Sequence, residues 1–197
     1  DSMGEVLVPD DAYYGAQTQR ASDNFPISDR RLPNSLIKSL AMIKKSAAIV
    51  NNKLDKIDVT FKDAIVTACD EIIGGKYDGQ FIVDIFQTGS GTSSNMNMNE
   101  VISNRANEIL GHGLGEKFPI HPNDHVNLGQ SSNDTFPTSI YLSVYLEITS
   151  SLFPKLKSMS KTLKSKSDEF SGIIKIGRTH LQDATPLTLG QEISGYV

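Results

Sequence analysis

The chain has almost no cysteine: Cys69 is the single one among 197 residues, which excludes an internal disulfide. One thiol suits a reducing compartment, and we expect Cys69 to be a small core residue on a helix. No apolar run approaches the length of a membrane span. The first ten residues are acidic and lack a long apolar run, so we expect no signal peptide. These absences favour the cytoplasm, or the mitochondrial matrix in a eukaryote.

The chain also lacks an excess of positive charge. It has 19 Lys and Arg against 23 Asp and Glu, which argues against nucleic acid as a partner. The hydrophobic content of 38% and charged content of 21% predict a packed core rather than disorder. There is no internal repeat or low-complexity tract. The chain begins without Met and ends inside a segment that reads as helix, so we expect a fragment of a longer protein.

Apolar spacing predicts a mainly α fold of one or two domains. The first long helix follows Pro33, with Asn34 or Ser35 as its N-cap. Its expected buried stripe is Leu36, Leu40, Ile43, Ala47, Val50 and Leu54. A second helix is expected to begin at a capping-box-like pair, Thr60 and Asp63, and to end at 74–75. It carries the apolar residues Ile65, Ala68 and Ile72.

Three further helices are expected. One begins near Ser93 or Ser94 and ends at Gly111, burying Met98, Val101, Ile102, Ala106 and Ile109. The next has Pro137 in its first turn, and Pro154 kinks or breaks it. Its lysines, Lys155, Lys157, Lys161 and Lys164, indicate a solvated face rather than a binding patch. The last begins with Thr185 as N-cap and Pro186 as first residue. Residues 6–9 and 173–176 are expected to be extended, and 81–86 imitates a strand.

Three polar loops are rich in hydroxyl and amide side chains, and each ends at or near an expected helix start. Loop 1 is residues 89–95, loop 2 is 121–134 and loop 3 is 177–191. A helix N-terminus offers free N–H groups and a positive dipole, so it binds carboxylates without many basic residues. Capping needs only one such side chain. The three runs together therefore predict a site for a small polyanion.

Other motif interpretations are weaker. Loop 1 has two glycines of a dinucleotide-binding pattern, but Ser94 stands where the third is needed, and it lacks the end of a P-loop. Loop 2 lacks the final glycine of a hydrolase nucleophile elbow. His121, Asp124 and His125 are possible metal ligands, although Pro122 lies between them and no His-Glu-x-x-His pattern exists.

His180 is the best candidate for proton transfer, because an imidazole titrates near neutral pH. It is one of four histidines and stands in loop 3 between Thr179 and Gln182, close to Arg178. A lone histidine is more often structural, and its polar surroundings favour the catalytic interpretation.

At these residues the chain resembles class II fumarate hydratases, of the fumarase/aspartase superfamily. The resemblance runs along the whole chain and includes residues 8–9, 14–20 and 87–97 besides loops 2 and 3. It implies reversible hydration of fumarate to L-malate, a step of the tricarboxylic acid cycle, with no metal or organic cofactor. It also implies a homotetramer. The domains would be a mostly helical N-terminal domain, 1–130, and the start of a long central helical bundle, 131–197.

The resemblance also implies roles for individual residues. His180 matches the active-site histidine that transfers a proton through a bound water. The matching substrate-binding residues are Ser90, Thr92, Ser131, Ser132, Asn133 and Thr179. A secondary dicarboxylate site near the active-site entrance would comprise His121, Asn123 and Asp124. The family builds each active site from three subunits, so the three loops are expected to come from different chains.

Two alternatives remain open. Aspartate ammonia-lyases share most of this pattern, but they usually have Gln in place of His180 and Asn in place of His121. A non-catalytic helical assembly protein, like the crystallin relatives, is the other. The family's catalytic serine stands on a mobile Gly-Ser-Ser loop that this chain lacks, so we expect the chain alone to be inactive.

Overall fold

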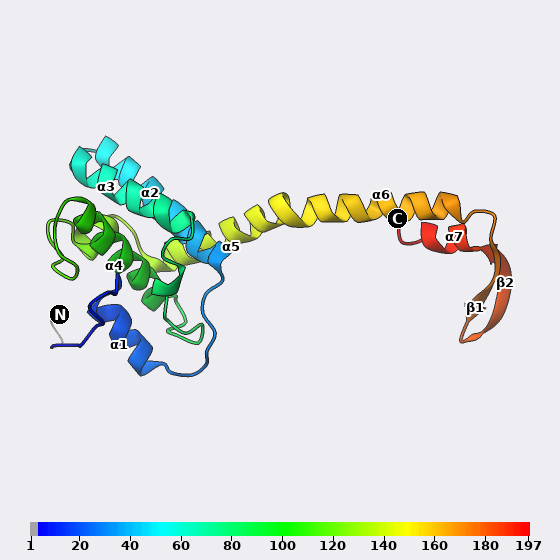
Figure 1. Cartoon of the computed structure of the whole chain (residues 1–197), viewed down its shortest axis with the longest axis horizontal. Helices are drawn as coiled ribbons and strands as arrows, with labels where there is room; N and C mark the ends of the chain where they lie inside the picture. The colour runs from blue at the N-terminus through cyan, green and yellow to red at the C-terminus, as the bar shows by residue number, and fades with distance from the viewer. Residues whose placement is uncertain (1–3) are drawn as a thin grey trace. The chain divides into compact units, whose positions relative to one another are not determined.

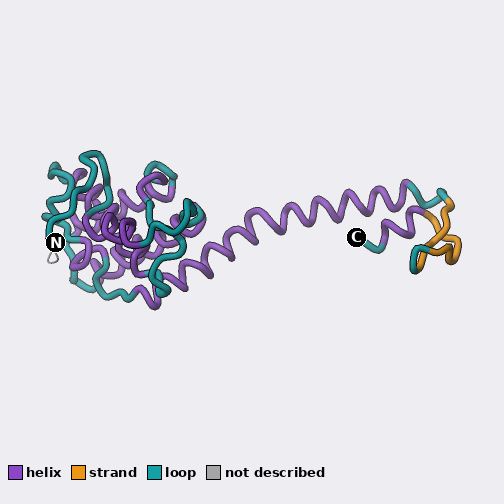
Figure 2. The backbone as a smooth tube through the Cα atoms, turned by 90° about the horizontal axis from the view of Figure 1, so that it is seen from below, coloured by secondary structure: helices purple, strands orange, loops and turns teal. Residues whose placement is uncertain are grey.

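The computed structural model describes residues 4–197, and it consists of two compact units, Asp1–Val144 (unit 1) and Tyr145–Val197 (unit 2). Helices make up most of both units, and regular strands lie within residues 174–188 of the described part (Figures 1 and 2). The expected mainly α fold is therefore confirmed. The domain boundary expected after residue 130 remains a prediction for the whole protein. No helix in residues 4–197 has both the length and the apolar character for a membrane span.

Unit 1 packs its helices around α4. The elements that it contains or begins are α1 (Ala16–Asn24), α2 (Asn34–Lys53), α3 (Val59–Ile73), the 3-10 turn η1 (Asp78–Gln80), α4 (Thr92–Ile109), the π-helical turn η2 (Pro122–Val126) and α5 (Ser132–Glu147). Helices α1, α2 and α3 all contact α4 (Figure 1). The core also confirms Cys69 as a buried helical residue. Most of the buried face of α4 is as expected, although Ile109 is 37% exposed.

The predicted face of α2 is wrong by part of a turn. Of the expected stripe Leu40 is buried, whereas Val50 and Leu54 are exposed. The residues that α2 does bury are Ile37, Ser39, Leu40, Ala41, Lys44 and Ala48. The expected face instead borders a groove of about 390 Å³ with Leu128 and Leu142. A period of 3.6 fits both faces, and the sequence alone does not say which one other elements cover.

Several predicted helix starts are wrong. Pro33 precedes α2 without any side-chain cap, and Asp58, not Thr60, caps α3 by accepting a hydrogen bond from the Thr60 N–H. The end of α3 at Gly74 is as expected. Pro137 lies inside α5 rather than in its first turn. Residues 6–9 and 81–86 form no strand, apart from an isolated bridge between Asp84 and Arg31.

Unit 2 contains the end of α5, the π-helical turn η3 (Ile148–Leu152), α6 (Phe153–Glu169), strands β1 (Ile174–Thr179) and β2 (Gln182–Thr188), and α7 (Leu189–Ser194). The chain stays helical across the expected kink or break near Pro154: the π-helical turn η3 ends at Leu152, Phe153 keeps right-handed helical backbone angles, and Pro154 lies in the first turn of α6. Helix α7 packs on α6 at Gly190, where a Cβ would lie 2.3 Å from the Ser167 carbonyl oxygen. The expected extended segment is confirmed as β1.

Candidate functional site

Loop 1 makes a tight entry into α4. Gly91 precedes the helix with φ of +69°, a left-handed conformation that glycine adopts without strain. A Cβ at this position would lie 2.3 Å from Cγ of Phe136, so the glycine also lets the α5 ring pack against the loop. Both requirements place glycine at 91. Loop 1 is therefore held against the first turns of α5.

The first turns of α4 and α5 meet through hydroxyl groups. The Thr92 Oγ1 lies 2.8 Å from Ser90 Oγ and 3.0 Å from Ser132 Oγ, so three predicted substrate residues form one hydrogen-bonded chain. Thr92 and Ser132 are the first residues of their helices. Two positive helix ends thus converge on a patch of hydroxyls, which is the arrangement that favours a bound carboxylate.

The other two predicted residues of loop 2 lie beside this patch. The Ser131 hydroxyl accepts the N–H of Asn133 at 3.3 Å, and the Ser131 carbonyl accepts the N–H groups of Asp134 and Thr135. Ser131 and Asn133 are exposed, whereas Thr135 is buried. Both exposed side chains therefore flank Ser132 at the start of α5.

One expectation about these loops is wrong. Loops 1 and 2 were expected to come from different chains of the assembly. The hydrogen bond between Thr92 and Ser132 and the contact of Gly91 with Phe136 join them within unit 1 of one chain. The pattern of residues did not reveal this, because the two loops are separated by all of α4 in the sequence.

The beginning of loop 2 is a π-helical turn closed by two histidines. The His121 Nδ1 accepts the N–H groups of Asn123 and Asp124, both at 3.3 Å, and His125 Nδ1 accepts the His121 N–H at 2.9 Å. Burial lowers the pKa of His125. Both Nδ1 atoms thus serve the backbone, and within residues 4–197 no group of three His, Cys, Asp or Glu side chains is arranged to hold a metal. The secondary dicarboxylate site remains a prediction.

Loop 3 ends at a helix start, as the sequence suggested, because α7 begins at Leu189, but most of the loop before it is strand. It forms most of an antiparallel hairpin in which Thr179 pairs with Gln182, and His180 and Leu181 form the two-residue turn. Both turn residues have positive φ, of 47° and 62°, as the primed turns of tight hairpins require. Thr185 and Pro186 lie in β2, and α7 begins later.

The cap of α7 is Thr188. Its hydroxyl accepts the Gln191 N–H at 3.0 Å while the Gln191 side chain accepts the Thr188 N–H at 2.8 Å, a reciprocal capping box. The predicted cap at Thr185 is therefore wrong by three residues. Thr179 and His180 lie together at the exposed tip of the hairpin, in unit 2. The structure thus brings Ser90, Thr92 and Ser132 together in one unit and Thr179 and His180 in the other.

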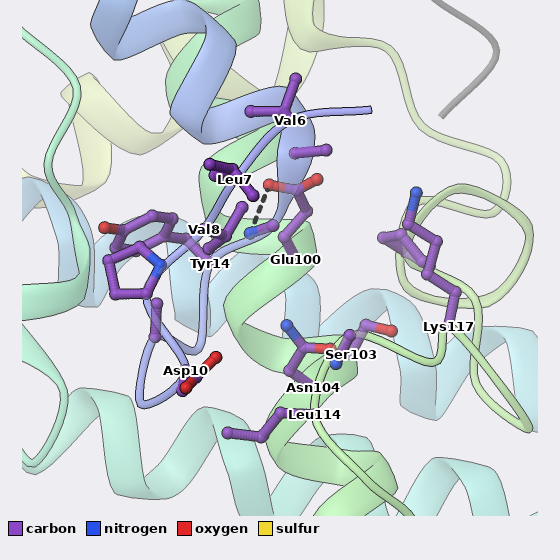
Figure 3. A pocket seen from close by; sticks show the side chains of 16 residues that line it. Val6, Leu7, Val8, Asp10, Tyr14, Glu100, Ser103, Asn104, Leu114 and Lys117 are labelled. Atoms are coloured by element: carbon purple, nitrogen blue, oxygen red, sulfur yellow. Dashed lines mark hydrogen bonds between the residues drawn. The ribbon is translucent and has the colours of Figure 1, made fainter. Parts of the chain in front are cut away.

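A cavity of about 460 Å³ in unit 1 is not the candidate site (Figure 3). Its buried carboxylate, Glu100, accepts hydrogen bonds from Gly15 N, Gln17 N, Thr18 N and Thr18 Oγ1 at 2.6–3.1 Å, and so caps α1 from α4. None of the predicted substrate residues lines this cavity. Its one buried acid is already satisfied by the protein, so the role of Glu100 is structural.

The sequence missed one buried polar residue close to loop 2. Lys44, in the middle of α2, is 0% exposed, and its ammonium group donates to Asn127 Oδ1 and Gln130 Oε1, both at 2.9 Å. Burial lowers its pKa to about 7. A signal existed in the sequence: Ile37, Leu40, Ala41, Lys44 and Ala48 share one helical face, so a lysine stands in an otherwise small and apolar stripe.

Comparisons with known proteins show the family to which the chain belongs. The family model described as "Lyase" matches residues 4–197. The chain is 58% identical over 197 residues to the class II fumarate hydratase of Campylobacter jejuni and 56% identical to that of Neisseria meningitidis. It is fully covered in both matches and spans 42% and 43% of their lengths.

Two solved structures are also similar. The fumarate lyase:delta crystallin of Brucella melitensis, in native form, matches with a TM-score of 0.95 and 49% identity, and the recombinant class II fumarase of Schistosoma mansoni with 0.95 and 50%. Both comparisons cover the whole of this chain, and they cover 44% and 41% of the respective solved chains.

Proposed function

Because the chain belongs to the lyase family, whose model matches residues 4–197, we propose that the full-length protein adds water reversibly to fumarate, giving L-malate. The observation that carries this proposal is the meeting of two helix N-termini at a chain of hydroxyls, in a chain 58% identical to a class II fumarate hydratase. This assigns the protein to the tricarboxylic acid cycle.

One carboxylate of the substrate would bind where α4 and α5 begin. The proposed contacts are Ser90, Thr92, Ser131, Ser132 and Asn133. Removing a proton beside a carboxylate gives that group a second negative charge, so donors held in place before the reaction stabilise the transition state more than the ground state. The hydrogen bonds among Ser90, Thr92 and Ser132 support this, because they fix the hydroxyls in the absence of substrate.

His180 is the proposed proton-transfer residue, acting through a bound water, and Thr179 is a proposed substrate contact. The support is their exposure at the tip of a hairpin, where an imidazole is open to solvent. The catalytic base would be a serine outside this chain. We propose that several subunits together complete the active site.

We further propose a homotetramer in which unit 2 is covered by other subunits. Unit 2 exposes large apolar side chains: Leu152, Phe153, Leu156, Met159, Ile173, Ile174, Ile176, Leu181, Tyr196 and Val197. Such surface is costly in water and is typical of faces that associate. A cytoplasmic location agrees with the buried, unpaired Cys69, and a mitochondrial matrix location fits equally.

The test follows the ultraviolet absorbance of fumarate, whose conjugated double bond is lost on addition. The full-length protein is expected to remove the absorbance in water alone. Loss that requires ammonia would show an aspartate ammonia-lyase instead. Absence of change under both conditions, with a correctly assembled protein, would indicate a non-catalytic assembly protein.

A further inference from the structure

Lys44 carries its ammonium group at a buried position, where a charge is energetically unfavourable. Its side chain is fully buried in unit 1, and its two hydrogen-bond acceptors, Asn127 Oδ1 and Gln130 Oε1, are neutral amides rather than carboxylates. Moving an ammonium group out of water without a counter-charge costs several kcal/mol, roughly. An apolar residue of the same length would avoid that cost, so the lysine needs a reason other than filling space.

The two acceptors belong to loop 2 and fold it around the ammonium group. The side-chain amide of Asn127 donates to the Gln130 carbonyl at 3.2 Å, and that of Gln130 donates to the Val126 carbonyl at 2.9 Å. Their oxygens are thereby turned toward Lys44. The residue that follows Gln130 is Ser131, so the ammonium group anchors the chain directly before α5.

The hydrogen bonds of Asn127 also connect loop 2 to loop 1. Asn127 Oδ1 accepts a second hydrogen bond, from Asn95 Nδ2 at 3.1 Å, and Asn95 Oδ1 accepts one from Thr135 Oγ1 at 3.4 Å. Asn95 stands in the first turn of α4, and Thr135 in the first turn of α5. One oxygen therefore joins α2, α4 and loop 2, beneath the hydroxyls at the surface.

We propose that Lys44 is a positioning residue for the dicarboxylate site, which through Asn127 and Gln130 fixes the start of α5 against the start of α4. Lys44 itself makes no hydrogen bond to Ser90, Thr92 or Ser132, so it acts through the loop. The inference rests on the function proposed for these hydroxyls, and its structural part is measurable without substrate.

The test is Lys44→Met in the full-length protein, which keeps the length of the side chain and removes its donors. Loop 2 is expected to loosen, so amide hydrogen exchange in residues 127–135 rises at least tenfold. The KM for fumarate is expected to rise about tenfold, with a smaller change in kcat, since substrate-binding groups are displaced. Gln130→Met removes one acceptor of Lys44 together with the amide group that donates to the Val126 carbonyl, and it is expected to raise the exchange rate and the KM by about threefold each.

The matched control is Leu40→Ala, one turn earlier on the same buried face. It leaves a cavity and lowers the melting temperature, but Leu40 makes no side-chain hydrogen bond to loop 2. Exchange in residues 127–135 and the KM are expected to stay within twofold. The double variant Lys44→Met/Ser132→Ala should raise the KM by a factor that differs from the product of the two single effects, because both changes act on the start of α5.

The outcomes separate the two proposals. Wild type that does not hydrate fumarate overturns the proposed function, while the exchange measurement still decides the role of Lys44. Equal exchange in Lys44→Met, Gln130→Met and wild type overturns positioning, and so does an unchanged KM in an active protein. If Lys44→Met does not fold, Gln130→Met carries the same decision.

Discussion

The two units hold their polar loops by different means. In unit 1, loops 1 and 2 lie over buried side chains: Asn95 and Thr135 are 2% and 4% exposed and join helices that are far apart in the sequence. In unit 2, loop 3 is an exposed hairpin whose shape comes from neighbouring residues, through strand pairing and a two-residue turn. A binding surface thus depends on long-range packing, whereas the proposed proton-transfer residue depends on local backbone geometry.

The apolar residues follow the same division. The hydrophobic core cluster contains buried residues between Ile37 and Val126, all in unit 1. In unit 2 the buried residues are Ser167 and Gly190. A change in unit 1 should therefore affect both stability and binding, and a change at the hairpin tip should affect chemistry alone. The four predictions below test this difference.

The largest effect is expected at the hairpin tip. His180→Asn in the full-length protein should lower kcat by roughly 10²–10⁴, the range of general acid–base catalysis. Asparagine tolerates the positive φ at this position, so the melting temperature and the tetramer should stay unchanged. Lys175→Gln, on β1 of the same hairpin, is the control and should keep near-normal kcat. A His180→Asn enzyme with normal turnover would make His180 structural.

Gly91→Ala should damage unit 1 itself. The alanine needs φ of +69° and a Cβ that would overlap the Phe136 ring, so we expect a loss of about 2–4 kcal/mol in stability. Fumarate binding should weaken as loop 1 moves away from α5. Gly89→Ala is the control, since its Cβ would have nothing within 4 Å. Thermal melting and KM measure both. Equal melting temperatures for the two variants would refute the close contact.

A pair of Glu→Gln changes compares the units directly. Glu100→Gln places a donor against the N–H groups at the start of α1, and it should cost about 2 kcal/mol because the site is buried. Glu192→Gln breaks the exposed ion pair with Lys175 in unit 2 and should cost less than about 0.5 kcal/mol. Melting at one fixed protein concentration compares them. Similar losses would contradict the difference between the units.

The last prediction concerns the pH dependence of stability that Lys44 produces. Its pKa is about 7 when folded, against about 10.4 in an unfolded chain, so unfolding binds a proton between these values. Stability of wild type relative to Lys44→Met should be flat below about pH 7. It should then rise with pH, by at most about 1.4 kcal/mol per unit. Melting curves between about pH 6 and 9 measure this.

Cys69, on α3, is a titratable group close to Lys44, and only its thiolate form would oppose the lowering of the Lys44 pKa. Burial raises the pKa of its own thiol, so it stays neutral when folded. Its ionisation in the unfolded chain is the same for wild type and Lys44→Met, and it cancels in the comparison. A stability difference that falls as pH rises would contradict the burial of the Lys44 charge.

The sequence predicted the helices because their apolar residues recur with a helical period, and it predicted that the three polar segments end at helix starts because their composition is local. It failed where distant residues decide. Helix α2 turns Lys44 rather than Val50 inward, because other elements select the face that is covered. The error at the start of α3 is a separate, local one, since Asp58 itself accepts the Thr60 N–H. The hairpin of loop 3 was missed because its turn, His180-Leu181, contains neither glycine nor asparagine.

The same holds for the candidate site. The composition of the loops and the family resemblance identified Ser90, Thr92 and Ser132. Their side chains lie together in one unit because Gly91 lets the Phe136 ring pack against loop 1. No local pattern encodes that fit, because a glycine before a helix is also an ordinary turn residue.

The hairpin turn has a consequence for which mutations this chain can accept during evolution. His180 and Leu181 both occupy left-handed backbone positions, which asparagine and aspartate also accept, and neither side chain is buried in unit 2. A mutation that exchanges the imidazole for an amide or a carboxylate therefore meets no folding barrier within its own unit. Substitutions that change the chemistry of this tip should therefore cost little stability, whereas almost any substitution of Gly91 should destabilise unit 1.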